Sequence, residues 1–191
     1  MGTSAAAAIA ALAVGATDLE ADDIAALAVI ADSAEAWSRA TPLHLTASAL
    51  VVHPGSGQVL LRWHQRQLAW LQVGGHGDPG ETDPLAIALR EGLEETGLDD
   101  LRPWPDADAP SLLHVVVVDV PANDREPAHR HGDLRYLLAT DHPERAVAED
   151  DGAPLRWVSV PDAMALTREE NLRETIRRAE AQLSRGDPRS P

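Results

Sequence analysis

The stretch that decides the fold is GGHGDPGETDPLAIALREGLEETGL, residues 74–98. It predicts a glycine-rich loop followed by a helix. Asp83 is a good N-cap residue, Pro84 suits the first helical position, and Gly97 stands where a left-handed C-cap belongs. The start signal, the stop signal and the spacing of apolar residues agree, so we expect a helix from Pro84 to the residue before Gly97.

This predicted helix carries a row of like charges. Glu91, Glu94 and Glu95 stand at positions i, i+3 and i+4, which share one helix face. Like charges on one face destabilise an isolated helix, so a positive partner is expected among them. Carboxylates suit hard divalent ions, which can orient a pyrophosphate and lower the pKa of a bound water. The stretch therefore favours a metal site that serves a phosphate compound, although a solvated acidic face is the alternative.

The same residues resemble the Nudix box. That pattern reads Gly, five residues, Glu, seven residues, Arg-Glu, an apolar residue, any residue, Glu-Glu, any residue, Gly and an apolar residue. The matching positions are Gly75, Glu81, Arg90, Glu91, Glu94, Glu95, Gly97 and Leu98. The chain departs from the pattern by one extra residue between Glu81 and Arg90, and by Gly92 at an apolar position. We expect the loop to absorb the insertion and Gly92 to allow close packing on a sheet.

The resemblance extends beyond the box and implies a fold. The segments HLTASALVVHPGSGQVLLRWH and AWLQVGGH resemble the strands before the box in one bacterial group of the family, and LRWVSV resembles a late strand. The expected fold class is α/β, an α/β/α sandwich with a mixed β-sheet. The expected domains are an N-terminal helical extension at 1–41, the Nudix domain at 42–185 and a flexible tail at 186–191.

The resemblance also implies an activity and roles for the box residues. The activity is hydrolysis of the pyrophosphate bond of a nucleoside diphosphate linked to another group, by water attack with Mg²⁺ or Mn²⁺. By position, Glu91, Glu94 and Glu95 would bind the metal and one of them, such as Glu91, would assist the water. Arg90 is counted among the catalytic residues, with a structural role: it would bond to Glu81 or to a nearby carbonyl. Gly75 would lend its backbone to the metal or phosphate, and Gly97 would end the helix.

Outward from the box, alternation and turn residues predict the remaining elements. A helix is expected at 18–38 after a capping box at 17–20, docked on the domain or on a second copy. The run at 112–120 reads as a central strand buried on both faces. A last helix follows a second capping box formed by Thr167 and Glu170. Further strands are expected at 44–53, 58–63, 70–73, 134–140 and 156–160, loops at 101–110 and 123–132, and a short helix from Pro161.

Several residues outside the box are candidates for substrate contact. His76 directly follows Gly75 and would lie beside the site. The segment HRHGDLRY supplies candidates for substrate contact, metal contact or a general base: His129, His131, Asp133 and Arg135. The alternatives are a loop histidine bonded to backbone and an exposed polar turn.

Two further groups are less specific. Trp70 and Trp63 could stack on a base, or could simply pack in the core. The acidic run Glu149, Asp150 and Asp151 could supply an extra ligand, or could be a solvated loop.

Composition limits the partners. The net charge of −15 disfavours nucleic acid, because a phosphate-backbone binder needs a basic stripe, and it argues against an RNA-decapping role. No apolar run is suited to span a bilayer. The absence of Cys fits a reducing compartment, so we expect a cytoplasmic protein, with a homodimer possible.

Two alternatives remain on the same fold. One is a nucleotide-sensing domain without turnover, which the complete Glu set disfavours. The other is an isoprenoid diphosphate isomerase, a class that relies on a catalytic Cys absent here.

Overall fold

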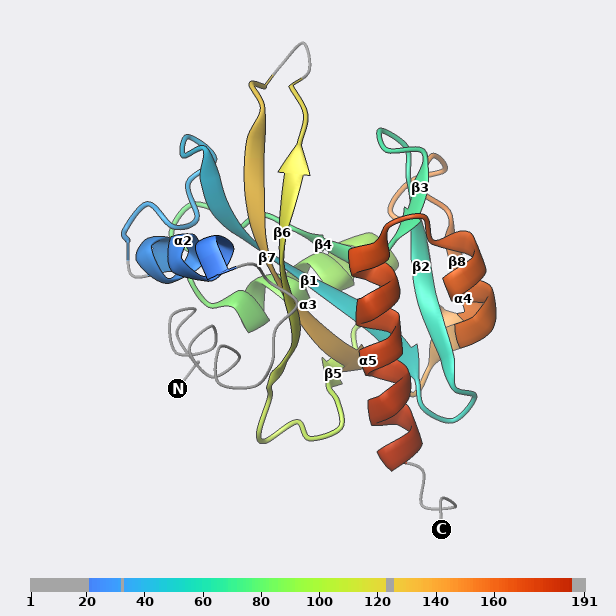
Figure 1. The fold of residues 1–191 in the computed structure, drawn as a ribbon. Helices are drawn as coiled ribbons and strands as arrows, with labels where there is room; N and C mark the ends of the chain where they lie inside the picture. Colours follow the sequence, from blue (N-terminus) through green and yellow to red (C-terminus); the bar gives the residue numbers. More distant parts are fainter. Residues whose placement is uncertain (1–20, 32, 123–125, 187–191) are drawn as a thin grey trace.

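The computed structural model describes residues 21–31, 33–122 and 126–186 (Figure 1). In chain order the elements are α2 (Ala21–Ala31), β1 (Leu43–His53), β2 (Gln58–His64), β3 (Ala69–Leu71), β4 (Val73–Gly75), α3 (Pro84–Thr96), β5 (Arg102–Pro103), β6 (Leu112–Val120), β7 (His129–Ala139), the 3₁₀ turn η1 (Pro143–Arg145), β8 (Leu155–Ser159), α4 (Val160–Leu166) and α5 (Glu170–Gly186). Most of the predicted strands and the central helix are confirmed. In the described part of the chain, no helix is long and apolar enough to cross a membrane.

The strands form one mixed sheet in the order β3-β2-β1-β7-β5. β1 and β7 pair in parallel, with His44 opposite His131 and Thr46 opposite Asp133. On its other edge β1 pairs antiparallel with β2 near its end and with β4 near its middle, where Ala47 lies opposite Gly75. This arrangement places the end of β4, and the loop that leads into α3, beside the centre of the sheet.

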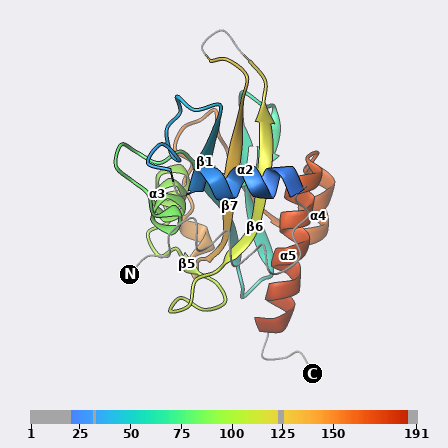
Figure 2. The same cartoon turned by 60° about the vertical axis from the view of Figure 1, so that its left-hand side comes forward.

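Helices cover both faces of the sheet (Figure 2). Successive residues of a strand point to opposite faces, so β1 contributes to two cores. Ala49 packs with Ile87 of α3 on one face. Leu50 packs with Leu172 and Ile176 of α5 on the other. The predicted α/β/α sandwich is therefore confirmed.

The ends of α3 match the sequence signals. The Asp83 side chain accepts hydrogen bonds from the backbone N–H groups of Leu85 and Ala86, at 3.0 and 3.3 Å. Gly97 adopts φ 66°, and its N–H donates to a carbonyl of the last turn. A Cβ at Gly92 would lie 2.7 Å from Leu101 Cδ1, so the glycine does permit close packing. These features hold α3 against the sheet in one register.

The predicted central position of the run at 112–120 is wrong. Among the described residues β6 pairs only with β7, whereas β1 has partners on both edges. Val115 is buried beneath α2, but Asp119 near the strand end is exposed. The strand buried throughout its interior is β1, although it carries polar residues such as Thr46 and Ser48. Burial of those polar groups depends on partners from β7, which the sequence pattern does not show.

Both loop predictions also need correction. Residues 102–103 pair with β7, so the segment 101–110 is not a loop throughout. β7 begins at His129, so His129 and His131 lie on a strand and not in a loop. The reason is the long parallel pairing with β1, which extends β7 past the polar residues that suggested a turn.

The helix predictions at the two ends are only partly correct. α2 ends at Ala31, and residues 33–37 form turns instead of continuing the helix to 38. The Thr167 hydroxyl is buried without a hydrogen-bond partner among the described residues, so the predicted capping box with Glu170 is not formed. Thr167 instead ends α4. The predicted capping box at 17–20 and the residues of the tail from 187 lie outside the described residues.

α2 docks on its own domain. Leu27 is fully buried and packs with Leu45, Val115 and Leu134. Beneath it lies Gly132 of β7, where an added Cβ would clash with the Leu27 side chain. An ion pair between Asp23 and the β7 residue Arg130, at 3.0 Å, adds a polar tie. The sequence left open whether this helix docks on its own domain or on a second copy, and in the structure it packs on its own domain.

We predict that Leu27→Ala lowers the free energy of unfolding by about 2–5 kcal/mol, because it leaves a cavity between α2 and the sheet. Urea denaturation measures this change. Val29→Ala is the matched control on the same helix. Its side chain is 79% exposed, so a change within about 0.5 kcal/mol is expected. Equal effects of the two substitutions would contradict the docking of α2.

Candidate active site

Three carboxylates of α3 form one surface, the carboxylate face, made of Glu91, Glu94 and Glu95. The side chains of Glu91 and Glu95 are 16% and 13% exposed, and that of Glu94 is 51% exposed. Exposure therefore increases across the face, from the sheet side, where a buried charge is costly, to the solvent side. The helical spacing predicted from sequence brings these three residues together.

Two glycines of β4 lie against the buried part of this face. A Cβ at Gly75 would lie 2.6–2.8 Å from the Glu91 carboxylate group, so any other residue here would force that carboxylate to move. The Gly74 N–H donates to Glu95 Oε2 at 2.9 Å. The main chain of β4 thus forms the wall opposite the carboxylates, and contact of the Gly75 backbone with a metal or phosphate stays a prediction.

The Arg90 guanidinium connects the helix to the preceding loop. Its Nε and Nη2 bond the Glu81 carboxylate at 2.9–3.2 Å, and Nη2 also donates to the His76 carbonyl at 2.9 Å. Nη1 lies 3.1 Å from Glu91 Oε1 and 2.9 Å from Glu94 Oε2. Arg90 is therefore the positive partner of two carboxylates as well as the anchor of the loop.

A second cation reaches the site from β2. Arg62 pairs with Glu95 at 3.2 Å and with Glu149 at 3.1 Å. This contact brings the late acidic segment to the rim of the carboxylate face. Asp150, next in that segment, instead accepts a local hydrogen bond from the Gly152 N–H in a turn.

Burial opposes ionisation of the inner carboxylates. It raises the pKa of Glu91, and it raises the pKa of Glu95 to about 7 although the Gly74 N–H and Arg62 act in the opposite direction. By contrast, the hydrogen bond from Arg90 lowers the pKa of Glu81. The Gly74 N–H and Arg62 thus offset only part of the cost of burying a charge at Glu95.

Four imidazoles meet beside the loop that follows β4. This four-histidine cluster contains His44 of β1, His76, and His129 and His131 of β7. The His44 and His76 Nε2 atoms are 3.1 Å apart, as are those of His129 and His131. Burial lowers the pKa of His76 to about 3 and that of His131 to about 4. The structure thus brings together the sequence candidates His76 and His131.

Asp133 and Arg135 belong to a different, buried network. Asp133 accepts hydrogen bonds from Thr46 and Ser48 at 3.1 and 2.9 Å, and pairs with Arg135 at 2.8 Å. Arg135 also donates to Thr175 of α5 at 2.9 Å. These contacts pair a charge that would be costly if buried alone. Substrate contact by Asp133 stays a prediction, and the network holds β1, β7 and α5 together.

The two tryptophans pack against each other at the sheet edge. Trp63 and Trp70 lie opposite each other on β2 and β3, with ring centroids 5.5 Å apart in an edge-on arrangement. The Arg156 guanidinium lies 5.9 Å from the centroid of the Trp70 ring. Trp70 also packs against the core beneath α5. Base stacking by Trp70 stays a prediction.

With this geometry in view, a comparison with family models decides the family. The model of the NUDIX domain matches residues 42–179, more than half of the chain. The chain belongs to the Nudix family.

Individual relatives agree with this assignment. The chain is 35% identical over 109 residues to the probable DHNTP pyrophosphohydrolase of Lactococcus lactis, a match covering 56% of this chain and 60% of that protein, so the chain spans less than two thirds of its relative. Among solved structures, it resembles the E. coli dihydroneopterin triphosphate pyrophosphohydrolase (TM-score 0.53, 21% identity, 71% and 92% of the two chains). It also resembles a C. elegans Ap4A hydrolase (TM-score 0.57, 19% identity, 73% and 97%). At these identities the structural likeness shows a shared fold.

The Nudix box tolerates its extra residue because the insertion lies in the loop. Glu81 accepts the Asp78 N–H at 2.8 Å, and its own N–H donates to the Asp78 carbonyl at 2.9 Å. This tight turn directs the Glu81 carboxylate to Arg90. The one-residue departure from the family pattern thus leaves the contact between Glu81 and Arg90 in place.

The donor set of the box fits a hard divalent ion. Carboxylate oxygens and a main-chain wall without side chains suit Mg²⁺ or Mn²⁺. In this structure Arg90 Nη1 lies between Glu91 and Glu94, so the three carboxylates do not converge on one point. Glu94 is the most exposed of the three, and only its Oε2 is bonded to Arg90.

Sequence reasoning missed two residues of this region. Arg62 lies within a strand pattern far from the box. It reaches Glu95 only because β2 and β4 both pair with β1. The second is His44, to which the sequence pattern assigns no role, although it lies directly opposite His131 on the neighbouring strand. Knowledge of the β1–β7 register would have placed His44 in the cluster, but the sequence contains no signal for parallel pairing.

We predict a pH effect on stability through Glu95. A carboxyl with a raised pKa stabilises the fold at low pH, and that contribution is lost as the pH rises through about 7. In EDTA, wild type should therefore lose roughly 1–3 kcal/mol of unfolding free energy between pH 5 and pH 8 relative to Glu95→Gln. Urea denaturation at both pH values measures this. A difference between the two proteins that is independent of pH would contradict the assignment.

Proposed function

We propose that the protein is a metal-dependent Nudix pyrophosphohydrolase that cleaves a pyrophosphate bond by water attack. The observation that carries this is the carboxylate face of α3, set against the glycines of β4 and braced by Arg90, in a chain of the Nudix family. Residues 42–185 form the catalytic domain in this proposal, and α2 belongs to an extension that stabilises it. The proposed setting is the cytoplasm.

Each residue has a role that follows from its position. Glu91, Glu94 and Glu95, with the Gly75 backbone, would hold Mg²⁺ or Mn²⁺, and the ion when bound would screen the pyrophosphate and acidify a bound water. Glu91, whose side chain is largely buried and whose pKa is raised by that burial, is the proposed acceptor of the water proton.

The supporting residues fix this constellation. Arg90 holds the loop through Glu81 and the His76 carbonyl, so it keeps the β4 glycines facing the helix. Arg62 offsets part of the charge of Glu95.

The proposed substrate class is a small molecule with a pyrophosphate linkage on a nucleoside or a pterin. The relative from Lactococcus lactis, named a probable DHNTP pyrophosphohydrolase, supports the pterin triphosphate, and the Ap4A hydrolase fold supports dinucleoside polyphosphates. Trp70, His76, His131 and Asp133 are the proposed substrate contacts outside the box. A panel of dihydroneopterin triphosphate, Ap4A, nucleoside triphosphates, nucleotide sugars, ADP-ribose, NADH and coenzyme A would separate these classes by the phosphate product released.

We predict that Glu94→Gln lowers kcat by roughly 10²-fold or more on the best substrate of that panel, because an essential ligand or base is lost. The melting temperature should change little, since half of this side chain is exposed. Glu144→Gln, a surface carboxylate on η1 that is 68% exposed, is the matched control and should keep wild-type kcat. Full activity in Glu94→Gln would sink the site assignment.

We predict that chelation of divalent ions with EDTA abolishes turnover and that Mg²⁺ or Mn²⁺ restores it. The reason is that the carboxylate oxygens of α3 are ligands for hard divalent ions. The measurement is phosphate release before and after the metal is returned. Undiminished turnover in EDTA would contradict the metal-dependent mechanism. Nucleotide binding without turnover across the whole panel would instead favour the sensing domain.

A further inference from the structure

The four-histidine cluster is assembled from three separate segments. His129 and His131 stand at i and i+2 on β7 and so point to the same face of the sheet. His44 lies on the neighbouring strand, in register with His131. His76 reaches the cluster from the loop after β4, at 3.1 Å from His44. Three of these histidines, His44, His129 and His131, have ligand atoms that all lie within 4.8 Å of one another. In the described part of the chain, this is the group of three or more possible ligands that could hold a metal ion.

Backbone carbonyls orient two of these rings. His44 Nδ1 lies 2.9 Å from the Thr41 carbonyl, and His129 Nδ1 lies 2.9 Å from the Pro127 carbonyl. A carbonyl only accepts, so both Nδ1 atoms carry a proton, and Nε2 is the nitrogen of each ring that remains to bind an ion. An N–H donated to a backbone carbonyl is the usual outer contact of a metal-binding histidine.

Nitrogen spacing in the cluster is close to that of ligands on one ion. Histidine nitrogens bind Zn²⁺ at about 2.0–2.1 Å, so two of them at a tetrahedral ion are about 3.4 Å apart. The Nε2 atoms of His129 and His131 are 3.1 Å apart, and those of His44 and His76 are also 3.1 Å apart. The ligand atoms of His44, His129 and His131 all lie within 4.8 Å of one another, so small shifts of these side chains would bring one nitrogen from each around an ion.

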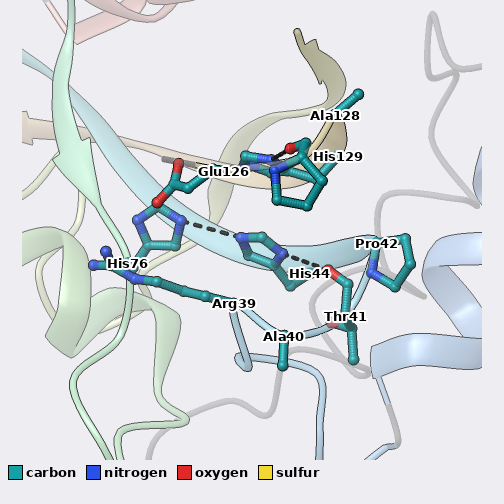
Figure 3. A pocket seen from close by; sticks show the side chains of 10 residues that line it. Arg39, Ala40, Thr41, Pro42, His44, His76, Glu126, Ala128 and His129 are labelled. Carbon is teal, nitrogen blue, oxygen red and sulfur yellow. Dashed lines mark hydrogen bonds between the residues drawn. The ribbon is translucent and has the colours of Figure 1, made fainter. Parts of the chain in front are cut away.

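The cluster opens onto a pocket (Figure 3). Its lining includes Arg39 and Glu126 as well as His44, His76 and His129, and its volume is about 220 Å³. That space admits a water molecule or an anionic oxygen as a fourth ligand.

We propose that His44, His129 and His131 form a binding site for one divalent transition-metal ion of the Zn²⁺ type, with the fourth position facing the pocket beside His76. Imidazole suits Zn²⁺ and similar ions, whereas Mg²⁺ prefers oxygen ligands. The site is therefore chemically distinct from the carboxylate face of α3. The two are joined through His76, whose carbonyl accepts a hydrogen bond from Arg90.

Titration of the untagged full-length chain with Zn²⁺ at pH 7.5, in competition with a chromophoric chelator, tests this proposal. Excess Mg²⁺ is kept present so that the carboxylate face does not contribute. One equivalent of Zn²⁺ should bind. His129→Gln and His131→Gln should each weaken the affinity by more than about tenfold, since even loss of an outer contact costs about that much. His142→Gln, at a partly exposed histidine outside the cluster, is the matched control and should bind as wild type does.

The melting temperature of each variant without metal establishes that it is folded. His129 and His131 are preferred to His44, because His44 is only 1% exposed and its replacement risks the fold. Co²⁺ in place of Zn²⁺ should give the intense visible absorption of a tetrahedral ion in wild type and not in His129→Gln. Absence of stoichiometric Zn²⁺ binding, or wild-type affinity in His129→Gln and His131→Gln, would overturn the proposal. Both results are independent of pyrophosphate hydrolysis.

Discussion

The candidate active site depends on how the charge of the carboxylate face is balanced. A helix that buries two carboxylates against a sheet, beside a third that is half exposed, would be unstable without a counter-charge. Arg90 provides it from within the same helix, with Nη1 on Glu91 and Glu94 and the rest of the guanidinium on Glu81 and a loop carbonyl. One side chain therefore sets both the electrostatics of the helix and the path of the loop that precedes it.

The parallel pairing of β1 with β7 organises the remainder of the molecule. It aligns His44 with His131 and Thr46 with Asp133, so imidazoles gather at one end of the strands and a buried ion pair lies further along. The same two strands carry the apolar residues that receive α2. A carboxylate site on α3 and a histidine cluster on the sheet are thus neighbours because β4 and its loop run between them.

The box region was largely predictable because its information is local. The cap at Asp83, the left-handed Gly97 and the helical spacing of the glutamates act over a few residues, and each is found in the structure. The contact of Glu81 with Arg90 was less certain, because an inserted residue can be absorbed in several ways. Here a turn from Asp78 to Glu81, just before the inserted residue, directs Glu81 to Arg90, and that turn is a property of the folded loop.

By itself the sequence determined the helix α3, its carboxylate face and the order of most strands, since propensity, capping and periodicity are encoded along the chain. Tertiary structure alone decided that β1, and not the valine-rich β6, is the buried central strand. It also decided that Arg62 reaches Glu95 and that four histidines from distant segments meet. These contacts depend on strand register and on which strands are neighbours, and neither quantity is carried by local sequence pattern.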